Sequence, residues 1–219
     1  MKIYCFSGLG ADHRVFSNLK LNFEFEVVPW LVPLSYTESF DSYLKRIRTM
    51  YFSDEKDVVM IGVSFGGLAA QMMAELIPSS KLILISTAIN RKQIPNFYNW
   101  IRPFLRFIPY QFLKPPYYLL KYFFGIKTKK ASILLNQIIG DTDTRFVKWA
   151  IGQLLIWQDL KLDESTVCIH GVNDRVLLDA AHVNYHITNG GHFTIVEECD
   201  QISEIINQTL EKFKKGIDH

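Results

Sequence analysis

A serine placed between two glycines is the feature of this sequence that most clearly suggests chemistry. Residues 58–67 read VVMIGVSFGG, so Ser64 follows an apolar run, with Gly62 two residues before it and Gly66 two residues after it. Residues 68–77 then form a strong helix pattern that stops before a proline. A sharp turn from strand to helix exposes the serine hydroxyl, and the helix N-terminus favours negative charge beside it. The pattern predicts a nucleophile at Ser64; an ordinary glycine turn is the alternative.

A serine hydroxyl needs a base to become a good nucleophile, and His192 is the candidate among six histidines. It stands in residues 189–193 (NGGHF), directly after the last predicted strand. Loops that leave the carboxyl ends of parallel strands meet at one edge of the sheet, where Ser64 is also expected. A simple glycine-rich surface turn is the alternative interpretation of this segment.

The base in turn needs an acid that orients its ring, and Asp174 fits this role. It stands just past an apolar run, and the order Ser64, Asp174, His192 places each group at a strand end. Asp179 is the reserve candidate. An Asx turn without a catalytic role is the alternative for Asp174.

A loop with two glycines follows the first apolar run and could form an oxyanion hole. Residues 6–12 read FSGLGAD, and we assign the backbone amides of Leu9 and Phe65 as the donors that stabilise a tetrahedral intermediate. Nucleotide binding does not fit this loop, because His13 stands where a third glycine would be needed and no P-loop Lys-Ser/Thr follows.

The elements that must position these groups are visible as apolar runs and helical patterns. Short apolar runs predict six strands, at 3–6, 25–29, 58–61, 82–85, 167–170 and 183–187. Most runs are continuous, as expected when helices cover both faces of a parallel sheet. Helical spacing occurs between them, at 39–51, 68–77 and 201–213. The alternation predicts an α/β fold with right-handed crossovers.

The alternation stops between residues 91 and 160, where aromatic helical stretches are interrupted by prolines. We predict a helical cap insertion over 91–160 and a core domain made of 1–90 and 161–219. Residues 92–130 hold eight basic side chains and no acidic one, interleaved with aromatics. Three interpretations stay open: a cap packed on the sheet with solvated lysines outside, a hydrophobic acyl pocket with a basic mouth, and weak attachment to an anionic membrane surface.

Composition narrows the class of protein further. The 219 residues carry 24 basic and 22 acidic side chains, a near-balance that gives no support to nucleic-acid binding. Cys5 and Cys168 stand in apolar runs, which indicates buried thiols, and no cysteine pair has metal-ligand spacing. Neither a secretory signal nor a transmembrane segment is predicted. We expect a cytoplasmic protein that needs no metal and no organic cofactor.

With these residues in place, the sequence resembles the α/β-hydrolase superfamily, and within it small bacterial members. The resemblance rests on residues 6–12, 62–67, 169–174 and 190–193. It implies a mainly parallel sheet of about six strands flanked by helices, because the usual first two strands are absent. Two features depart from the pattern: Ser7 stands where a histidine is common, and only 17 residues separate the acid from the histidine.

The predicted activity is cleavage of a small-molecule carboxylic ester or thioester through an acyl-enzyme on Ser64. Two alternatives stay open because this superfamily hosts many chemistries. One is a ligand-binding receptor with little turnover, and the other is an acyltransferase or lyase that uses the same residues. The fate of the acyl group distinguishes them, since only a hydrolase releases the free acid.

Overall fold

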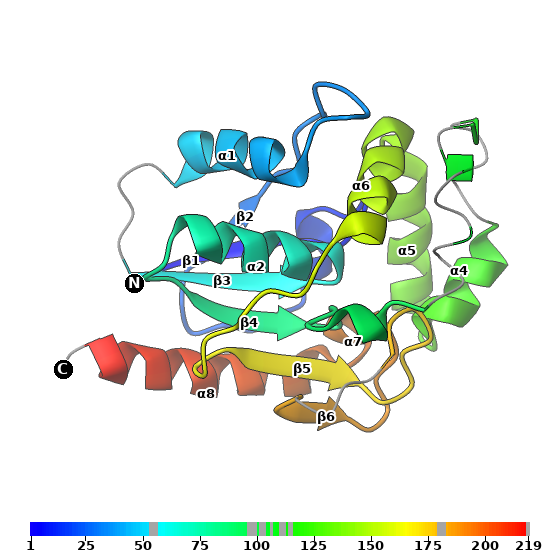
Figure 1. Cartoon of the computed structure of the whole chain (residues 1–219). Coiled ribbons are helices and arrows are strands. Elements are labelled where there is room, and N and C mark those ends of the chain that lie inside the picture. Colours follow the sequence, from blue (N-terminus) through cyan, green and yellow to red (C-terminus); the bar gives the residue numbers. More distant parts are fainter. Residues whose placement is uncertain are drawn as a thin grey trace.

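A six-stranded parallel sheet forms the centre of the computed structural model (Figure 1), which describes residues 1–52, 57–95, 100, 104–105, 107–109, 113, 116–178 and 183–217. The strands lie in the order β2-β1-β3-β4-β5-β6, and every neighbouring pair is parallel. Their bounds are β1 Lys2–Phe6, β2 Glu26–Val28, β3 Val58–Val63, β4 Lys81–Ile85, β5 Val167–Gly171 and β6 Tyr185–Ile187. All six predicted strands are therefore confirmed.

Helices cover both faces of the sheet, as the continuous apolar strands predicted (Figure 1). One face carries α1 (Phe40–Tyr51) and α2 (Phe65–Leu76), and the other carries α8 (Cys199–Ile217). Alternate residues of β1 point to opposite faces of the sheet: Tyr4 and Phe6 pack with α1 and α2, whereas Cys5 packs with α8. The 3-10 helix η1 (His13–Phe16) and the short helix α7 (Thr194–Glu197) also belong to the core, and a second 3-10 helix, η2 (Arg91–Gln93), follows β4.

Local sequence explains where α1 begins and which side it buries. The Ser39 side chain accepts a hydrogen bond from the Ser42 backbone N–H, which caps the first turn. Tyr43, Leu44 and Ile47 then follow at helical spacing and are buried against the sheet. The amphipathic pattern predicted for this segment is thus satisfied by packing on one face.

Between β4 and β5, the described residues include the helices α4 (Tyr117–Phe124), α5 (Lys129–Asp141) and α6 (Thr144–Ile156). They stand beyond the carboxyl ends of the strands (Figure 1). Within the described part of residues 91–160 there is no strand. We call residues 91–160 the cap; its status as a separate insertion stays a prediction.

Two further expectations concern the cysteines and the membrane. Cys5 and Cys168 are free and buried, and burial raises the pKa of both thiols. Among the helices that the structure describes, none combines the length and the apolar character needed to cross a bilayer.

Candidate active site

Ser64 lies on the turn between β3 and α2 in a strained backbone conformation. Its φ of 53° and ψ of −121° fall in a region that residues with side chains rarely adopt. The surrounding backbone fixes this conformation, because the Ser64 N–H donates to the Ile85 carbonyl at 2.9 Å and the Thr87 hydroxyl donates to the Ser64 carbonyl at 2.6 Å. These hydrogen bonds hold the strained turn in place, and the turn directs the Ser64 hydroxyl away from the strand and the helix.

The glycines around Ser64 are required by close backbone contacts. A Cβ atom on Gly66 would lie 2.3 Å from the carbonyl oxygens of Phe6 and Ser7, where β1 ends. A Cβ atom on Gly62 would lie 2.5 Å from the Cα atom of the glycine at position 67. The spacing seen in the sequence therefore reflects the packing of α2 against β1 and β3.

His192 lies between β6 and α7 and reaches the serine directly. Its Nε2 atom is 2.8 Å from the Ser64 Oγ atom, and its Nδ1 atom is 2.7 Å from the Asp174 Oδ2 atom. Both His192 and the Asp174 carboxylate are buried. The structure thus joins the three predicted residues in one hydrogen-bonded chain, while the reserve candidate Asp179 lies outside the described residues.

The backbone orients Asp174 and stabilises its charge. The Oδ1 atom accepts hydrogen bonds from the backbone N–H groups of Val176 and Leu177 at 2.8 and 3.0 Å. Burial by itself would raise the pKa of Asp174. The positive charge available on His192, its hydrogen bond and the Leu177 N–H outweigh burial and lower that pKa. The carboxylate is therefore ionised and ready to stabilise an imidazolium.

A second histidine contacts the same carboxylate, and the sequence did not indicate its place there. His170, interpreted as a core residue, is indeed buried at the end of β5. Its Nε2 atom lies 3.5 Å from the Asp174 Oδ2 atom and 3.3 Å from the Leu177 carbonyl oxygen. The one available signal was its position four residues before the acid, at the strand end that carries the acid loop.

The segments that carry the two amides assigned to an oxyanion hole lie next to Ser64. A Cβ atom on Gly8 would lie 3.6 Å from the Ser64 Cβ atom, so the loop that carries Leu9 runs directly beside the serine. Phe65 is the first residue of α2, where backbone N–H groups have no partner within the helix. Within the described residues, neither the Leu9 nor the Phe65 amide donates to a protein oxygen. Both amides thus have the donor capacity that the assignment requires.

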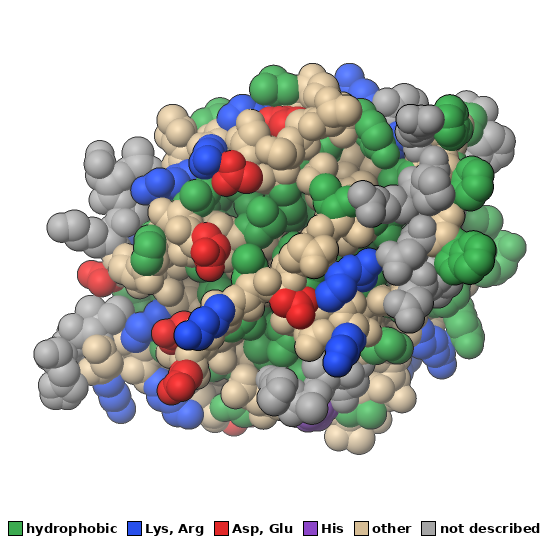
Figure 2. Space-filling model, in the orientation of Figure 1, with side chains coloured by type: hydrophobic (Ala, Val, Ile, Leu, Met, Phe, Trp, Pro, Cys, Tyr) green, Lys and Arg blue, Asp and Glu red, His purple; other side chains and the backbone are tan. Residues whose placement is uncertain are grey.

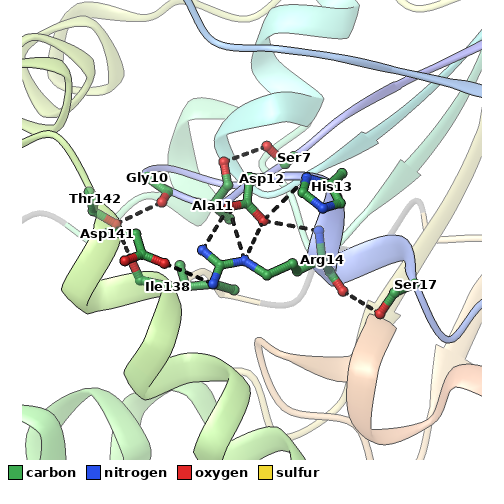
Figure 3. A network of polar contacts seen from close by, with 10 residues as sticks. All are labelled: Ser7, Gly10, Ala11, Asp12, His13, Arg14, Ser17, Ile138, Asp141 and Thr142. Atoms are coloured by element: carbon green, nitrogen blue, oxygen red, sulfur yellow. Dashed lines mark hydrogen bonds and ion pairs between the residues drawn. The ribbon is translucent and has the colours of Figure 1, made fainter.

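A polar network ties the loop after β1 to the cap (Figure 3). The Thr142 hydroxyl, between α5 and α6, lies 2.7 Å from the Gly10 carbonyl oxygen and 2.5 Å from the Ile138 carbonyl oxygen, and its single proton is shared between these two acceptors. Arg14 forms ion pairs with Asp12 at 2.7 Å and with Asp141 at 2.8 Å. Burial opposes the charge of Asp12, but the Arg14 guanidinium lowers the pKa of that carboxyl. Polar contacts with the cap therefore fix the position of the loop that contains Leu9.

A second cap contact lies on the histidine side of the site. The Phe124 carbonyl, at the end of α4, accepts a hydrogen bond from the Phe193 N–H at 3.1 Å. The Phe124 ring lies edge-on to the His192 ring, with 5.1 Å between ring centroids. Arg175 donates to the Tyr122 carbonyl at 2.9 Å. The C-terminal end of α4 therefore packs against the loops that carry the base and the acid.

A cavity of about 330 Å³ lies next to the loop after β1. Ser7 and Gly10 line it, together with Trp30 and Leu31 after β2 and Thr142 between α5 and α6. Ser64 and His192 are not part of this lining, so the acyl-pocket interpretation of the cap stays a prediction. In the part of the chain that the structure describes, no group of three His, Cys, Asp or Glu side chains is arranged to hold a metal ion.

Comparisons with known proteins add evidence about the fold. No known family profile and no curated protein matches the chain. A malate-bound thermophilic esterase from Thermogutta terrifontis matches with a TM-score of 0.76 and 14% identity, over 97% of this chain and 90% of that one. A hydrolase from Oleispira antarctica matches with a TM-score of 0.73 and 14% identity, over 96% and 91%. A meta-cleavage product hydrolase from Pseudomonas fluorescens matches with a TM-score of 0.67 and 18% identity, over 97% and 91%.

These similarities extend over almost the whole chain, including the cap. At 14% to 18% identity they show the fold and not the activity. The chain has the α/β-hydrolase fold, as the resemblance of its sequence predicted.

Proposed function

We propose that this protein is a serine hydrolase that cleaves a carboxylic ester or thioester of a small molecule through an acyl-enzyme on Ser64. The observation that carries the proposal is the hydrogen-bonded chain from Ser64 through His192 to Asp174, with distances of 2.8 and 2.7 Å. A binding protein would not need a strained serine beside a buried base. Solved structures with this fold include proteins named esterase and hydrolase, which favours the same class of reaction.

The first half of the reaction forms the acyl-enzyme. The Ser64 Oγ atom attacks the carbonyl carbon while His192 Nε2 accepts the hydroxyl proton, and Asp174 stabilises the imidazolium that results. The carbonyl oxygen takes up the negative charge, and the amides of Leu9 and Phe65 stabilise it. When the tetrahedral intermediate collapses, the bond to the alcohol or thiol breaks and His192 returns its proton to the leaving group.

The second half releases the acid. A water molecule attacks the acyl carbonyl while His192 takes one of its protons, and a second tetrahedral intermediate forms in the same oxyanion hole. Its collapse breaks the bond to the Ser64 Oγ atom, which regains a proton from His192. Both halves use only side chains and amides of this chain, together with water.

The test is turnover of p-nitrophenyl esters of graded acyl length by the wild type and by Ser64→Ala. We expect hydrolysis by the wild type and its loss in Ser64→Ala, with free acid as the product. Ser80→Ala is a matched control, because it removes a hydroxyl just beyond the other end of α2 and should keep activity. Circular dichroism checks that each variant is folded.

A fluorophosphonate probe with intact-mass readout gives a result that does not depend on the choice of substrate. We expect one adduct on the wild type and none on Ser64→Ala. Equal turnover by Ser64→Ala, or no adduct and no turnover by the folded wild type, would contradict the proposal. Transfer of the acyl group to an added alcohol in preference to water would identify an acyltransferase instead.

A further inference from the structure

The helix α4 exposes an apolar face to solvent. Its sequence is YYLLKYFF, and none of its residues is fully buried. Tyr117, Leu120 and Phe124 lie on the side that packs against the core cluster below α4. On the other side, the side chains of Tyr118, Leu119, Tyr122 and Phe123 are between 38% and 68% exposed. We call these four residues the α4 face.

Exposed aromatic side chains are concentrated in this part of the cap. Trp100, Phe104 and Phe107, which precede α4, are between 64% and 80% exposed. Among the described residues, every exposed Trp or Phe side chain lies between positions 100 and 123. Figure 2 shows hydrophobic side chains gathered at the edge of the molecule where Figure 1 draws α4. A concentration of exposed apolar side chains of this kind marks a candidate interaction site.

The charge of the same segment indicates which partner the α4 face fits. Residues 92–130 carry eight basic side chains, and no Asp or Glu occurs between positions 76 and 140. Lys121 is exposed within α4, and Lys129 is exposed soon after it. Two copies of so basic a segment would repel each other, whereas a bilayer with anionic headgroups attracts it. Tyrosine and tryptophan side chains suit the boundary between headgroups and acyl chains.

The α4 face also lies close to the candidate catalytic residues. The C-terminal end of α4 contacts the histidine loop through the Phe124 carbonyl, and the Phe124 ring lies beside His192. A bilayer that covers the α4 face would therefore lie next to the loop that carries the general base.

We propose that the α4 face docks onto an anionic lipid bilayer, and that the substrate is an ester presented at that lipid–water interface. The second part rests on the proposed hydrolase function, whereas the docking does not. The aromatic side chains enter the boundary region, and the lysines contact the headgroups. Binding therefore depends on both apolar contact and lipid charge.

Co-sedimentation with sucrose-loaded vesicles tests the docking without any catalytic step, because Ser64→Ala provides the background. We expect the Ser64→Ala variant to bind phosphatidylglycerol vesicles at least tenfold more tightly than phosphatidylcholine vesicles, and to bind them more weakly at high salt. Adding Tyr118→Ser and Phe123→Ser should weaken binding at least tenfold. Lys121→Glu should weaken binding to phosphatidylglycerol vesicles and leave binding to phosphatidylcholine vesicles unchanged. Met50→Ser is the matched control, an exposed apolar residue on α1.

Several results would overturn the docking. One is the absence of binding to either vesicle by the folded protein; another is equal binding by the Tyr118→Ser/Phe123→Ser variant. A dimer of the protein without vesicles, converted to a monomer by these two substitutions, would assign the α4 face to a second copy. Light scattering after size-exclusion chromatography measures that outcome.

The substrate part is tested by a ratio of rates on an active background. The rate on an ester embedded in phosphatidylglycerol vesicles is divided by the rate on soluble p-nitrophenyl acetate. We expect Tyr118→Ser/Phe123→Ser to lower this ratio at least tenfold and Met50→Ser to leave it unchanged. An unchanged ratio in both would refute the interfacial substrate. Vesicle binding without turnover of either ester and without a fluorophosphonate adduct would refute the hydrolase function and leave the docking supported.

Discussion

The two ends of the cap meet the core in different ways. The turn between α5 and α6 is fixed by polar contacts, from Thr142 to Gly10 and from Asp141 to Arg14. The helix α6 that follows is anchored by Trp149, which is buried and donates its indole N–H to the Glu38 carbonyl at 2.7 Å. In contrast, α4 has no fully buried residue and presents its apolar face to solvent.

This difference separates two tasks that a cap can perform. The α5–α6 end is tied to the loop that carries Leu9, so a change there acts on the geometry of the reaction. The exposed face of α4 contacts no reacting group, so a change there acts on what the protein binds. Neither end supplies a member of the Ser64–His192–Asp174 chain, which the core provides alone.

The largest expected effect on the rate is that of a substitution in the core, and the effects of substitutions in the cap are compared with it. Asp174→Asn keeps the shape of the side chain but removes the charge that stabilises the imidazolium. We expect kcat to fall by about 10³ to 10⁴, as in related arrangements of Ser, His and Asp. Steady-state kinetics on a soluble ester measures it. Activity within tenfold of the wild type would transfer the role of the acid to another carboxylate, of which Asp179 is the candidate.

The pH profile of the wild type gives the next largest effect. His192 must be neutral to accept the serine proton, so acid removes the active form. The pKa of Asp174 is lowered, so this carboxylate keeps its charge while the histidine takes up a proton. We therefore expect kcat/KM to fall tenfold per pH unit on the acid side, the slope of one proton. A slope of two protons would show that a second group of the site, Asp174 or the neighbouring His170, titrates in the same range, and the profile of Asp174→Asn would distinguish the two.

The fixed end of the cap should affect the rate more than substrate binding. Thr142→Val removes the hydroxyl that donates to the Gly10 carbonyl, which loosens the loop carrying Leu9. We expect kcat to fall about tenfold with little change in KM, because oxyanion donors act mainly in the transition state. Thr142→Ser should restore most of the rate by replacing the donor.

Thr49→Val is the matched control for this substitution. The Thr49 hydroxyl, on the exposed side of α1, donates to the Lys45 carbonyl four residues back, which matches the contact of the Thr142 hydroxyl with the Ile138 carbonyl but has no counterpart of the contact with Gly10. A similar loss of rate in Thr49→Val, or a rise in KM alone in Thr142→Val, would contradict the expectation that the α5–α6 end of the cap affects the rate through the loop that carries Leu9.

The sequence predicted the strands and the serine turn because their signals are local. Short runs of four or five residues and glycines two positions on either side of Ser64 are sufficient for both. The start of α2 was harder to predict: the sequence pattern placed the first helical residue at 68, whereas the helix begins at Phe65. Gly66 and Gly67 have low helix propensity, but their packing against the core places them in the first turn.

Contacts between distant segments explain what the sequence could not reveal. Arg14 and Asp141 are far apart in the chain, and no local pattern indicates that they form an ion pair. His170 lies beside Asp174 because the chain turns back after β5, so helical or strand periodicity does not apply there. The contact of Ser64, His192 and Asp174 could thus be predicted from the sequence, whereas the contacts of the cap with the neighbouring loops required the structure.

The smallest expected effect concerns the stability of the exposed end. Tyr118→Ser removes an aromatic ring that is mostly in water, so little buried apolar area is lost. We expect the free energy of unfolding, measured with urea in the absence of lipid, to change by no more than about 0.5 kcal/mol. Leu155→Ala, in buried packing on α6, should lower it by about 2 to 5 kcal/mol. A comparable loss in Tyr118→Ser would mean that the Tyr118 ring is packed in solution and not exposed to water, and the contrast between the two ends of the cap would disappear.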